Sequence, residues 1–264
     1  MTPTPVRPPA VAGSFYPAEP ARLRAQVERM LIEARCSADA RPRALIVPHA
    51  GYVYSGAVAA AAYARLAAWR DSYRRVVLLG PPHRVPVRGL ASSGAAAFAT
   101  PLGSMAVDRA AVSRFESHAA VQPSEAAHAR EHALEVQLPF LQATLEDVAI
   151  VPLLVGEVAP DTLADLLEPW WCDEDSLLLV SSDLSHFLDY AEALRRDSAT
   201  DATIRALDAS AIGPEQACGC RALNGLLALA ARHGAHIERL ALCTSGDTAG
   251  DRERVVGYAS YVLR

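Results

Sequence analysis

The sequence predicts an α/β fold of three layers, in which helices cover both faces of a central mixed, mostly parallel sheet. Segments with helical spacing alternate with short apolar runs, and these runs are continuously apolar instead of alternating with polar residues. Strands that are apolar on both faces are typical of a sheet buried between helices. No repeat, linker or low-complexity segment follows residue 20, which favours one domain over residues 1–264.

The elements are expected in the following order. Buried strands are predicted at 43–47, 74–80, 148–156 and 176–183, weaker strand and turn character at 89–103, and two last strands at 239–247 and 254–263. Helices are predicted at 21–35, 55–70, 108–118, 124–145, 189–210 and 214–233, with a short one near 161–170. Ser55 is a candidate N-cap, and Pro139 should kink or end its helix. Residues 1–20 are rich in proline and are expected to lie extended over the surface.

The composition argues against several classes of protein. The 264 residues are 51% hydrophobic and 21% charged, as in ordinary globular domains, and the net charge of -5 offers no basic field for nucleic acid. No apolar run approaches about 18 residues, so no membrane span is expected. The N-terminus lacks a charged region followed by an apolar core, so no signal peptide is expected and a cytoplasmic location is the default.

The cysteine and lysine content narrows the chemistry further. Five cysteines, an odd and scattered set, are expected to be reduced thiols; they lie at positions 36, 172, 218, 220 and 243. Cys218 and Cys220 form C-G-C, which is neither a redox C-x-x-C nor half of a zinc pair. All 25 basic residues are arginine. The absence of lysine excludes a Schiff-base mechanism and a P-loop.

Histidines and aspartates follow four of the predicted strands at their carboxyl ends. His49 follows the first strand, His83 the second, Asp183 and His186 the strand at 176–183, and Asp247 the strand at 239–247. In open α/β sheets this edge is where ligands bind. A separate loop role would explain each residue singly, but not their common position, so we expect them around one cleft.

Two histidines and a carboxylate are the ligands of a facial triad that holds a divalent metal and leaves positions open for substrate. His49 and His83 are the natural nitrogen ligands. We expect Asp247 to be the third ligand, because its Ser-Gly turn can aim a short side chain over the sheet edge. Asp183 and Cys243 are the alternatives, and an ordinary turn or capping role is the competing interpretation of Asp247.

Two more histidines are candidates for roles beside the metal. His186 is the best candidate for a general base, since an imidazole titrates near neutrality, and Asp183 could orient it or reach the metal. His132 is expected on a helix, where it would contact substrate or support a ligand, whereas His128 is expected at the surface. The segment H-A-R-E-H also matches an inverted zinc-protease motif. That motif specifies only three positions, and this interpretation would leave His49, His83 and His186 unused.

Eight blocks of the sequence resemble, in order, those of the Memo family, whose bacterial and archaeal members are called AmmeMemoRadiSam system protein B. The blocks are VAGSFYP, PHAGYVYSG, GPPH, TPLG, EHALEVQLPFLQ, SSDLSHF, SGD and VVGYAS. The resemblance extends from Val11 to the C-terminus. It implies a fold similar to the class III extradiol dioxygenases, in which two histidines and a glutamate hold iron(II) and another histidine acts as base.

Carried onto this sequence, the resemblance implies His49 and His83 as metal ligands, His186 at the base position and His132 as a further active-site histidine. The third ligand departs from the family pattern. Ring-cleaving enzymes have glutamate there and animal Memo proteins a cysteine, whereas this chain reads LCTSGDTAGD, with Asp247 the nearest fit and Cys243 displaced.

The expected cofactor is a divalent metal, Fe(II) first, with Zn and Cu as alternatives. The expected function is oxidative chemistry on an unidentified small molecule. An adaptor that binds an anionic peptide or partner protein through a vestigial metal site is one alternative, and a metal-assisted hydrolase is the other. The resemblance also implies a functional link to radical SAM and AMMECR-type proteins.

Overall fold

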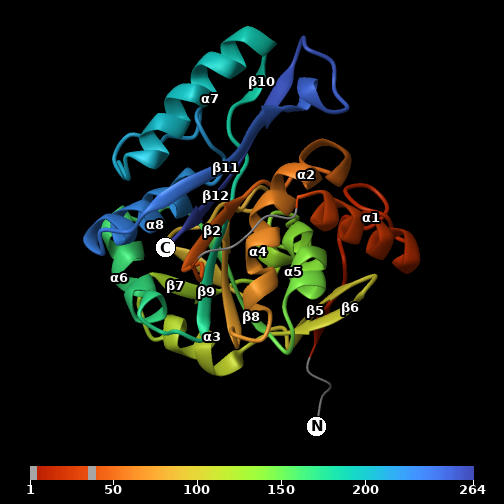
Figure 1. Ribbon diagram of the computed structural model, residues 1–264. Coiled ribbons are helices and arrows are strands. Elements are labelled where there is room, and N and C mark those ends of the chain that lie inside the picture. The colour runs from red at the N-terminus through yellow and green to blue at the C-terminus, as the bar shows by residue number, and fades with distance from the viewer. Residues whose placement is uncertain (1–4, 35–39) are drawn as a thin grey trace.

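A single large sheet crosses the molecule, as the computed structural model shows (Figure 1). The structure describes residues 5–34 and 40–264. Four parallel strands form the centre of the sheet, in the spatial order β2 (Ala44–Val47), β9 (Ser176–Ser181), β3 (Arg75–Gly80) and β8 (Ala149–Val155). Because they are parallel, their carboxyl ends meet at one edge.

Antiparallel strands flank this centre. On one side β12 (Val255–Leu263) pairs with β2, and both β10 (His186–Leu188) and β11 (Ile237–Thr244) pair with β12. On the other side β4 (Leu90–Ser92) pairs antiparallel with β8 and parallel with β7 (Val121–Pro123). The predicted mixed sheet is therefore confirmed, with its parallel strands at the centre. A small second sheet joins β1 (Val6–Arg7), β5 (Ala97–Thr100) and β6 (Gly103–Ala106).

Helices cover both faces of the large sheet, as predicted (Figure 1). One face carries α2 (Tyr52–Tyr63) with α1 (Pro20–Glu33) and α5 (Leu138–Thr144), and the other carries α6 (Pro160–Trp171), α7 (Tyr190–Arg205) and α8 (Cys220–Arg232). The remaining helical segments are η1 (Ala64–Trp69), α3 (Arg109–Glu116), α4 (Glu125–Ala129), η2 (Glu135–Gln137) and η3 (Ser245–Asp247).

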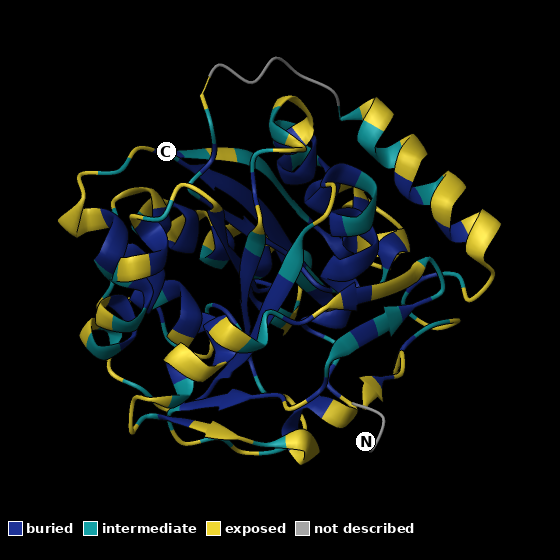
Figure 2. Cartoon of the chain, turned by 90° about the horizontal axis from the view of Figure 1, so that it is seen from below, coloured by how far each residue is buried: buried dark blue, intermediate teal, exposed yellow. Residues whose placement is uncertain are grey.

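The core lies between these layers. The central strands are buried over nearly their whole length, and the exposed positions lie mostly on the outer faces of the helices and in the loops (Figure 2). This explains why the strands are continuously apolar in the sequence. Among the described residues, no helix is both long and apolar enough to cross a membrane.

Two predicted helices begin elsewhere than expected. The predicted helix at 55–70 starts at Tyr52 with Gly51 as its N-cap, and the hydroxyl of Ser55 donates to the Ala50 carbonyl instead of capping a helix. The predicted helix at 214–233 starts only at Cys220.

The predicted helix over 124–145 is broken into α4, η2 and α5, with an irregular segment at 130–134. The side chain of Glu131 accepts hydrogen bonds from the backbone N–H groups of His132 and Ala133 and so competes with the helical pattern. Pro139 lies in the first turn of α5, where proline is tolerated, and neither kinks nor ends that helix.

The N-terminal segment runs over the surface and is anchored there by a few buried side chains. Arg7 is 5% exposed, and its guanidinium donates to the carbonyl oxygens of His128 and Glu131 and to the carboxylate of Glu135 at 2.7 Å. Glu135 in turn accepts from the backbone N–H groups of Ala10 and Val11. The segment therefore holds residues 128–135 in place, while most of its own residues from 5 to 20 are exposed; residues 1–4 lie outside the described part.

Candidate metal centre

Three histidines meet at the carboxyl edge of the central strands. His49 follows β2, His83 follows β3, and His132 lies in the irregular segment between α4 and η2. One ring nitrogen of each lies within 4.8 Å of the others. The ring centroids are 5.2 Å apart for His49 and His83, 5.4 Å for His49 and His132, and 4.7 Å for His83 and His132. We call these three residues the histidine cluster.

A hydrogen-bond network fixes which nitrogen of His49 carries its proton. Ser181 Oγ lies 2.7 Å from the Ala133 carbonyl, which can only accept, so the hydroxyl hydrogen points there. Gln137 Nε2 must face the Pro48 carbonyl for the same reason, and it also donates to Ser181 Oγ. His49 Nδ1, 2.9 Å from that oxygen, is therefore a donor too. His49 Nε2 therefore carries the lone pair, and the Cys218 thiol, 3.3 Å away, is the neighbour that can donate to it.

Glu131 fixes the proton of His83 on Nδ1, as Ser181 does for His49. Its carboxylate is 1% exposed and accepts from His83 Nδ1 at 2.9 Å and from the His83 backbone N–H at 2.6 Å. Burial alone would raise the pKa of Glu131, but the hydrogen bond and charge of His83, with further donors, lower it to about 2. A carboxylate that accepts from one nitrogen of a histidine orients the ring and makes the other nitrogen a better metal ligand.

His132 completes the cluster with a buried nitrogen. Its Nδ1 makes no hydrogen bond to any described residue, although it lies 3.2 Å from Glu131 Oε1. A buried ring nitrogen without a hydrogen bond, next to a carboxylate, fits a site that holds a cation.

Two rings of the histidine cluster, those of His49 and His132, favour the neutral form. Burial and, next, repulsion from His83 lower the pKa of His49 to about 3, and burial with repulsion from His49 lowers that of His132 to about 4. Both rings are therefore uncharged near neutral pH. Neutral imidazole is the form that binds metal ions.

Asp183 lies against the cluster but is not one of its three members. Its Oδ1 accepts from the His49 backbone N–H at 2.7 Å, and burial raises the pKa of its carboxyl group. His186 begins β10, is half-buried and influences the pKa of both His49 and Asp183 through its charge. Phe187, directly after it, has φ of 59°, a strained conformation for an aromatic residue of the kind that gathers at functional sites.

The structure does not bring Asp247 to the histidine cluster, and His132 takes the expected third place. Asp247 Oδ2 accepts from the backbone N–H and the hydroxyl of Thr244, both at 2.9 Å, and Oδ1 accepts from the Tyr190 hydroxyl at 2.6 Å. This is a capping box at the start of η3. The capping interpretation of Asp247 therefore describes its contacts. Cys243, the other alternative, lies in β11 opposite Tyr258.

His128 was predicted to lie at the surface, and this prediction was wrong. It is 1% exposed, its Nε2 lies 3.0 Å from the Ala91 carbonyl, and its ring packs against Phe98. Burial lowers the pKa of His128 to about 4. The two histidines of the H-A-R-E-H segment thus have separate environments, and only His132 reaches the histidine cluster.

Four residues beside the histidine cluster were missed in the sequence: Glu131, Gln137, Ser181 and Cys218. Glu131 lies inside the H-A-R-E-H segment, where the motif drew the interpretation to the two histidines on either side of it. Cys218 Sγ lies 3.3 Å from His49 Nε2, and burial raises the pKa of this thiol. Nothing in the spacing of C-G-C indicated that contact. The cysteines that the structure describes are all free, and Cys36 lies outside the described residues.

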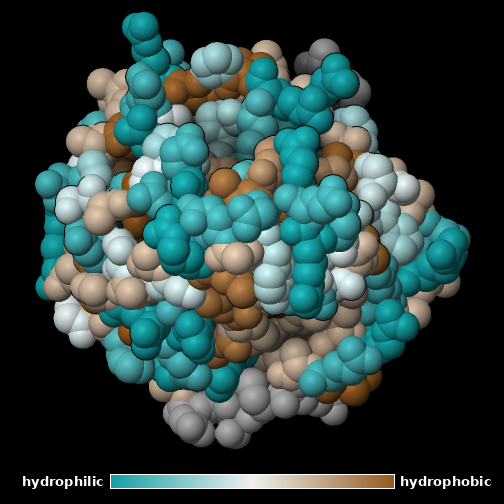
Figure 3. Space-filling view, turned by 90° about the horizontal axis from the view of Figure 1, so that it is seen from above, coloured by the Kyte–Doolittle hydropathy of each residue, from teal (hydrophilic) through white to brown (hydrophobic). Residues whose placement is uncertain are grey.

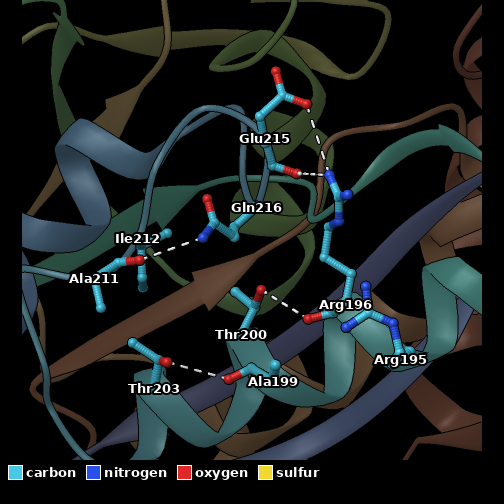
Figure 4. Close-up of a pocket in the computed structure, with 9 residues that line it drawn as sticks. All are labelled: Arg195, Arg196, Ala199, Thr200, Thr203, Ala211, Ile212, Glu215 and Gln216. Atoms are coloured by element: carbon cyan, nitrogen blue, oxygen red, sulfur yellow. Dashed lines mark hydrogen bonds and ion pairs between the residues drawn. The ribbon is translucent and has the colours of Figure 1, made fainter.

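One hollow of the surface lies beside α7, and none of the cluster histidines lines it. A hollow of about 540 Å³ separates α7 from the segment before α8, and Figure 4 shows Arg196 reaching across it to Glu215. None of the described residues that line it is a histidine or cysteine. On the side of the molecule that carries α7 and β10, apolar atoms form patches between hydrophilic side chains (Figure 3). The histidine cluster is therefore the better candidate for a site of chemistry.

The fold and the histidine cluster define an α/β protein with a candidate metal centre at the carboxyl edge of its sheet. A family model described as Memo-like protein matches residues 7–262. A MEMO1 family protein of Sulfolobus acidocaldarius is 34% identical and aligns with 97% of this chain and 98% of its own length. One of Archaeoglobus fulgidus is 35% identical, with 98% and 100% covered. The chain belongs to the Memo family, as its motifs predict.

A solved structure supports the architecture. The crystal structure of the uncharacterized protein JW3007 from Escherichia coli K12 is similar with a TM-score of 0.54 and covers 84% of this chain and 99% of that chain. The two sequences are 15% identical, so this likeness shows the fold alone.

Proposed function

We propose that the histidine cluster binds one divalent metal ion and that the protein uses it in oxidative chemistry on a small molecule. One observation carries the proposal: three ring nitrogens converge within 4.8 Å, and on two of the rings the other nitrogen is already committed to donating. Such a site is arranged for a metal before the metal arrives.

The donor set fits a first-row metal. Imidazole suits iron, copper, zinc and nickel, and three protein ligands leave further positions open for substrate and water. Fe(II) is our candidate because a redox-active ion supplies the electron-transfer chemistry that dioxygen requires. The carboxylate of Glu131, whose pKa is lowered to about 2, places negative charge beside the three rings and so favours a cation.

The remaining residues supply proton transfer and orientation. His186 is half-buried at the rim of the cluster and, in this proposal, takes a proton from a substrate hydroxyl. Asp183 fixes the His49 backbone and balances the charge that His186 acquires. The metal ligands and the base are thus on different loops, which lets each be tested separately.

Metal content and oxygen uptake, measured on the same preparations after anaerobic loading with Fe(II), test the proposal. His49→Ala should lose the metal. His186→Ala should keep it and lose turnover of a catechol by roughly 10²–10⁴-fold. Equal metal content in wild type and His49→Ala would refute the site, and metal loss in His186→Ala would make that residue a ligand. Metal retention without oxygen uptake by wild type would favour the adaptor alternative.

One observation favours a second candidate. Three imidazoles without a carboxylate are also the ligand set of catalytic zinc sites that activate water. A metal-assisted hydrolase would show activity on ester substrates with Zn(II) and no oxygen uptake with Fe(II). The two loaded forms of one preparation therefore separate the candidates.

A further inference from the structure

A second group of metal-ligating side chains lies where α6 meets the end of α8. Glu168 and Cys172 come from α6, and His233 follows α8; one ligand atom of each lies within 4.8 Å of the others. Glu168 Oε1 is 2.6 Å from His233 Nε2 and 3.7 Å from Cys172 Sγ. The carboxylate thus lies between the thiol and the imidazole.

The helices place these residues for simple reasons. Glu168 and Cys172 are four positions apart, so they project from one face of α6 on consecutive turns. α6 and α8 pack side by side (Figure 1), which brings His233 to the same face. The ring of Trp171 packs against that of His233 at 5.5 Å between centroids and limits its orientation.

The local electrostatics favour a cation. Cys172 is the C-cap of α6 and His233 is the C-cap of α8. Helix C-termini carry partial negative charge, so two of them together attract positive charge. Arg232, the residue before His233, pairs with Asp161 and Asp165 on α6 at 2.8 and 2.6 Å. The two aspartates are thus neutralised by Arg232, whereas the Glu168 carboxylate contacts both His233 and Cys172.

We propose that Glu168, Cys172 and His233 form a second metal site, selective for Zn(II), which is independent of the histidine cluster. Thiolate, imidazole and carboxylate are the three ligand types that zinc takes in proteins, and solvent supplies a fourth. Cys172 is exposed, so binding releases its thiol proton to water. The 2.6 Å pair of Glu168 and His233 must open to roughly 3.3 Å to admit an ion at normal ligand distances, which two partly exposed side chains permit.

Cobalt(II) is a suitable probe, because a thiolate ligand gives it a charge-transfer absorption in the near ultraviolet that nitrogen ligands do not. Titration of the chelator-treated full chain with Co(II) should produce this band in wild type and in His49→Ala. Cys172→Ser should abolish it, and His233→Gln should weaken Co(II) binding at least tenfold. Zn(II) should displace the cobalt and remove the band. Cys218→Ser, which alters the thiol beside His49, is the matched control and should retain it.

Absence of the band in wild type at excess Co(II) would overturn the proposal. So would a band that survives in Cys172→Ser, because the thiolate would then belong to another cysteine. The number of metal ions bound per chain distinguishes failure of this second site from failure of the histidine cluster. Two cobalt ions per chain are expected in wild type, with Cys172→Ser losing one and His49→Ala losing the other, and either loss can occur alone.

Discussion

His83 and Asp247 follow strands that end at the same edge of the sheet, and yet their side chains have opposite fates. β11 runs parallel to β2, because each is antiparallel to β12, so the Asp247 loop leaves the same edge of the sheet as the His49 loop. β11 extends further along β12, however, as far as the pair of Thr244 with Gly257, whereas β2 pairs with β12 only as far as Ile46 with Tyr261. The buried carboxylate of Glu131 accepts from His83 Nδ1, which leaves Nε2 to face the cluster. Asp247 uses both oxygens within its own turn and on Tyr190. Position at a strand end brings a side chain to the site, but what its atoms already bond decides whether it is available there.

Acid should act most strongly on the histidine side of this comparison. His49, His128 and His132 have pKa values near 3, 4 and 4, below the value of about 6.5 in an unfolded chain, so the unfolded state takes up more protons between these limits. The contribution of these histidines to the free energy of unfolding should therefore be fully present above pH 6.5 and should be lost as the pH decreases toward 4. Each residue contributes up to about 3 kcal/mol.

Denaturant unfolding at a series of pH values measures this loss. His128→Gln keeps a donor for the Ala91 carbonyl and removes one titrating group outside the proposed ligands. Its stability should fall less steeply than that of wild type between pH 6.5 and 4. An unchanged slope would show that His128 does not remain neutral in the folded protein.

Glu131→Gln should cause the next largest effect. The carboxylate accepts from His83 and from three backbone N–H groups, and an amide presents one of its own N–H groups to those donors. Hydrogen bonds to a buried charge are worth about 1.5–3 kcal/mol each, so we expect a loss of roughly 2–4 kcal/mol in the free energy of unfolding. Metal affinity should fall about 10–100-fold.

Isothermal titration with Zn(II) and denaturant unfolding give the two quantities for Glu131→Gln. Glu135→Gln is a useful comparison, since Glu135 is equally buried but contacts Arg7 and Tyr16 in place of a histidine. It should lower stability and leave metal affinity nearly unchanged. Equal losses of affinity in the two variants would mean that Glu131 acts only through the fold.

The sheet, its order of burial and the position of His49 and His83 were predictable, because they follow from continuous apolar strands and from the geometry of parallel strands. The helix at 124–145 was not, because its apolar spacing is helical while Glu131 and Glu135 bond to groups far along the chain. His132 was therefore placed on a helix face instead of in the cluster. The role of Asp247 could not be read from the sequence, because local capping leaves the same Ser-Gly-Asp signature as a strand-end ligand.

Ser181→Ala tests whether the neighbours of His49 fix its proton on Nδ1. The variant removes the acceptor of His49 Nδ1 and a partner of Gln137, so the ring is free to place its proton on either nitrogen. We expect Zn(II) affinity to fall about 10-fold or more and stability to fall by about 1–3 kcal/mol. Ser182→Ala is the matched control: this neighbouring buried hydroxyl bonds Asp183 and Gly219, so its loss should reduce stability without reducing affinity.

Asp247→Ala should have the smallest effect, and it bears directly on the opening comparison. Loss of the capping box at η3 and of the bond from Tyr190 should cost about 1 kcal/mol of stability, the usual value of a cap. Because the carboxylate is fully engaged in its own turn, metal content after Fe(II) loading should equal that of wild type. The measurement is metal per chain alongside His83→Ala, which should lose the ion. If Asp247→Ala also came out metal-free while remaining folded, its turn would have to rearrange on metal binding, and the triad of His49, His83 and Asp247 would replace the histidine cluster.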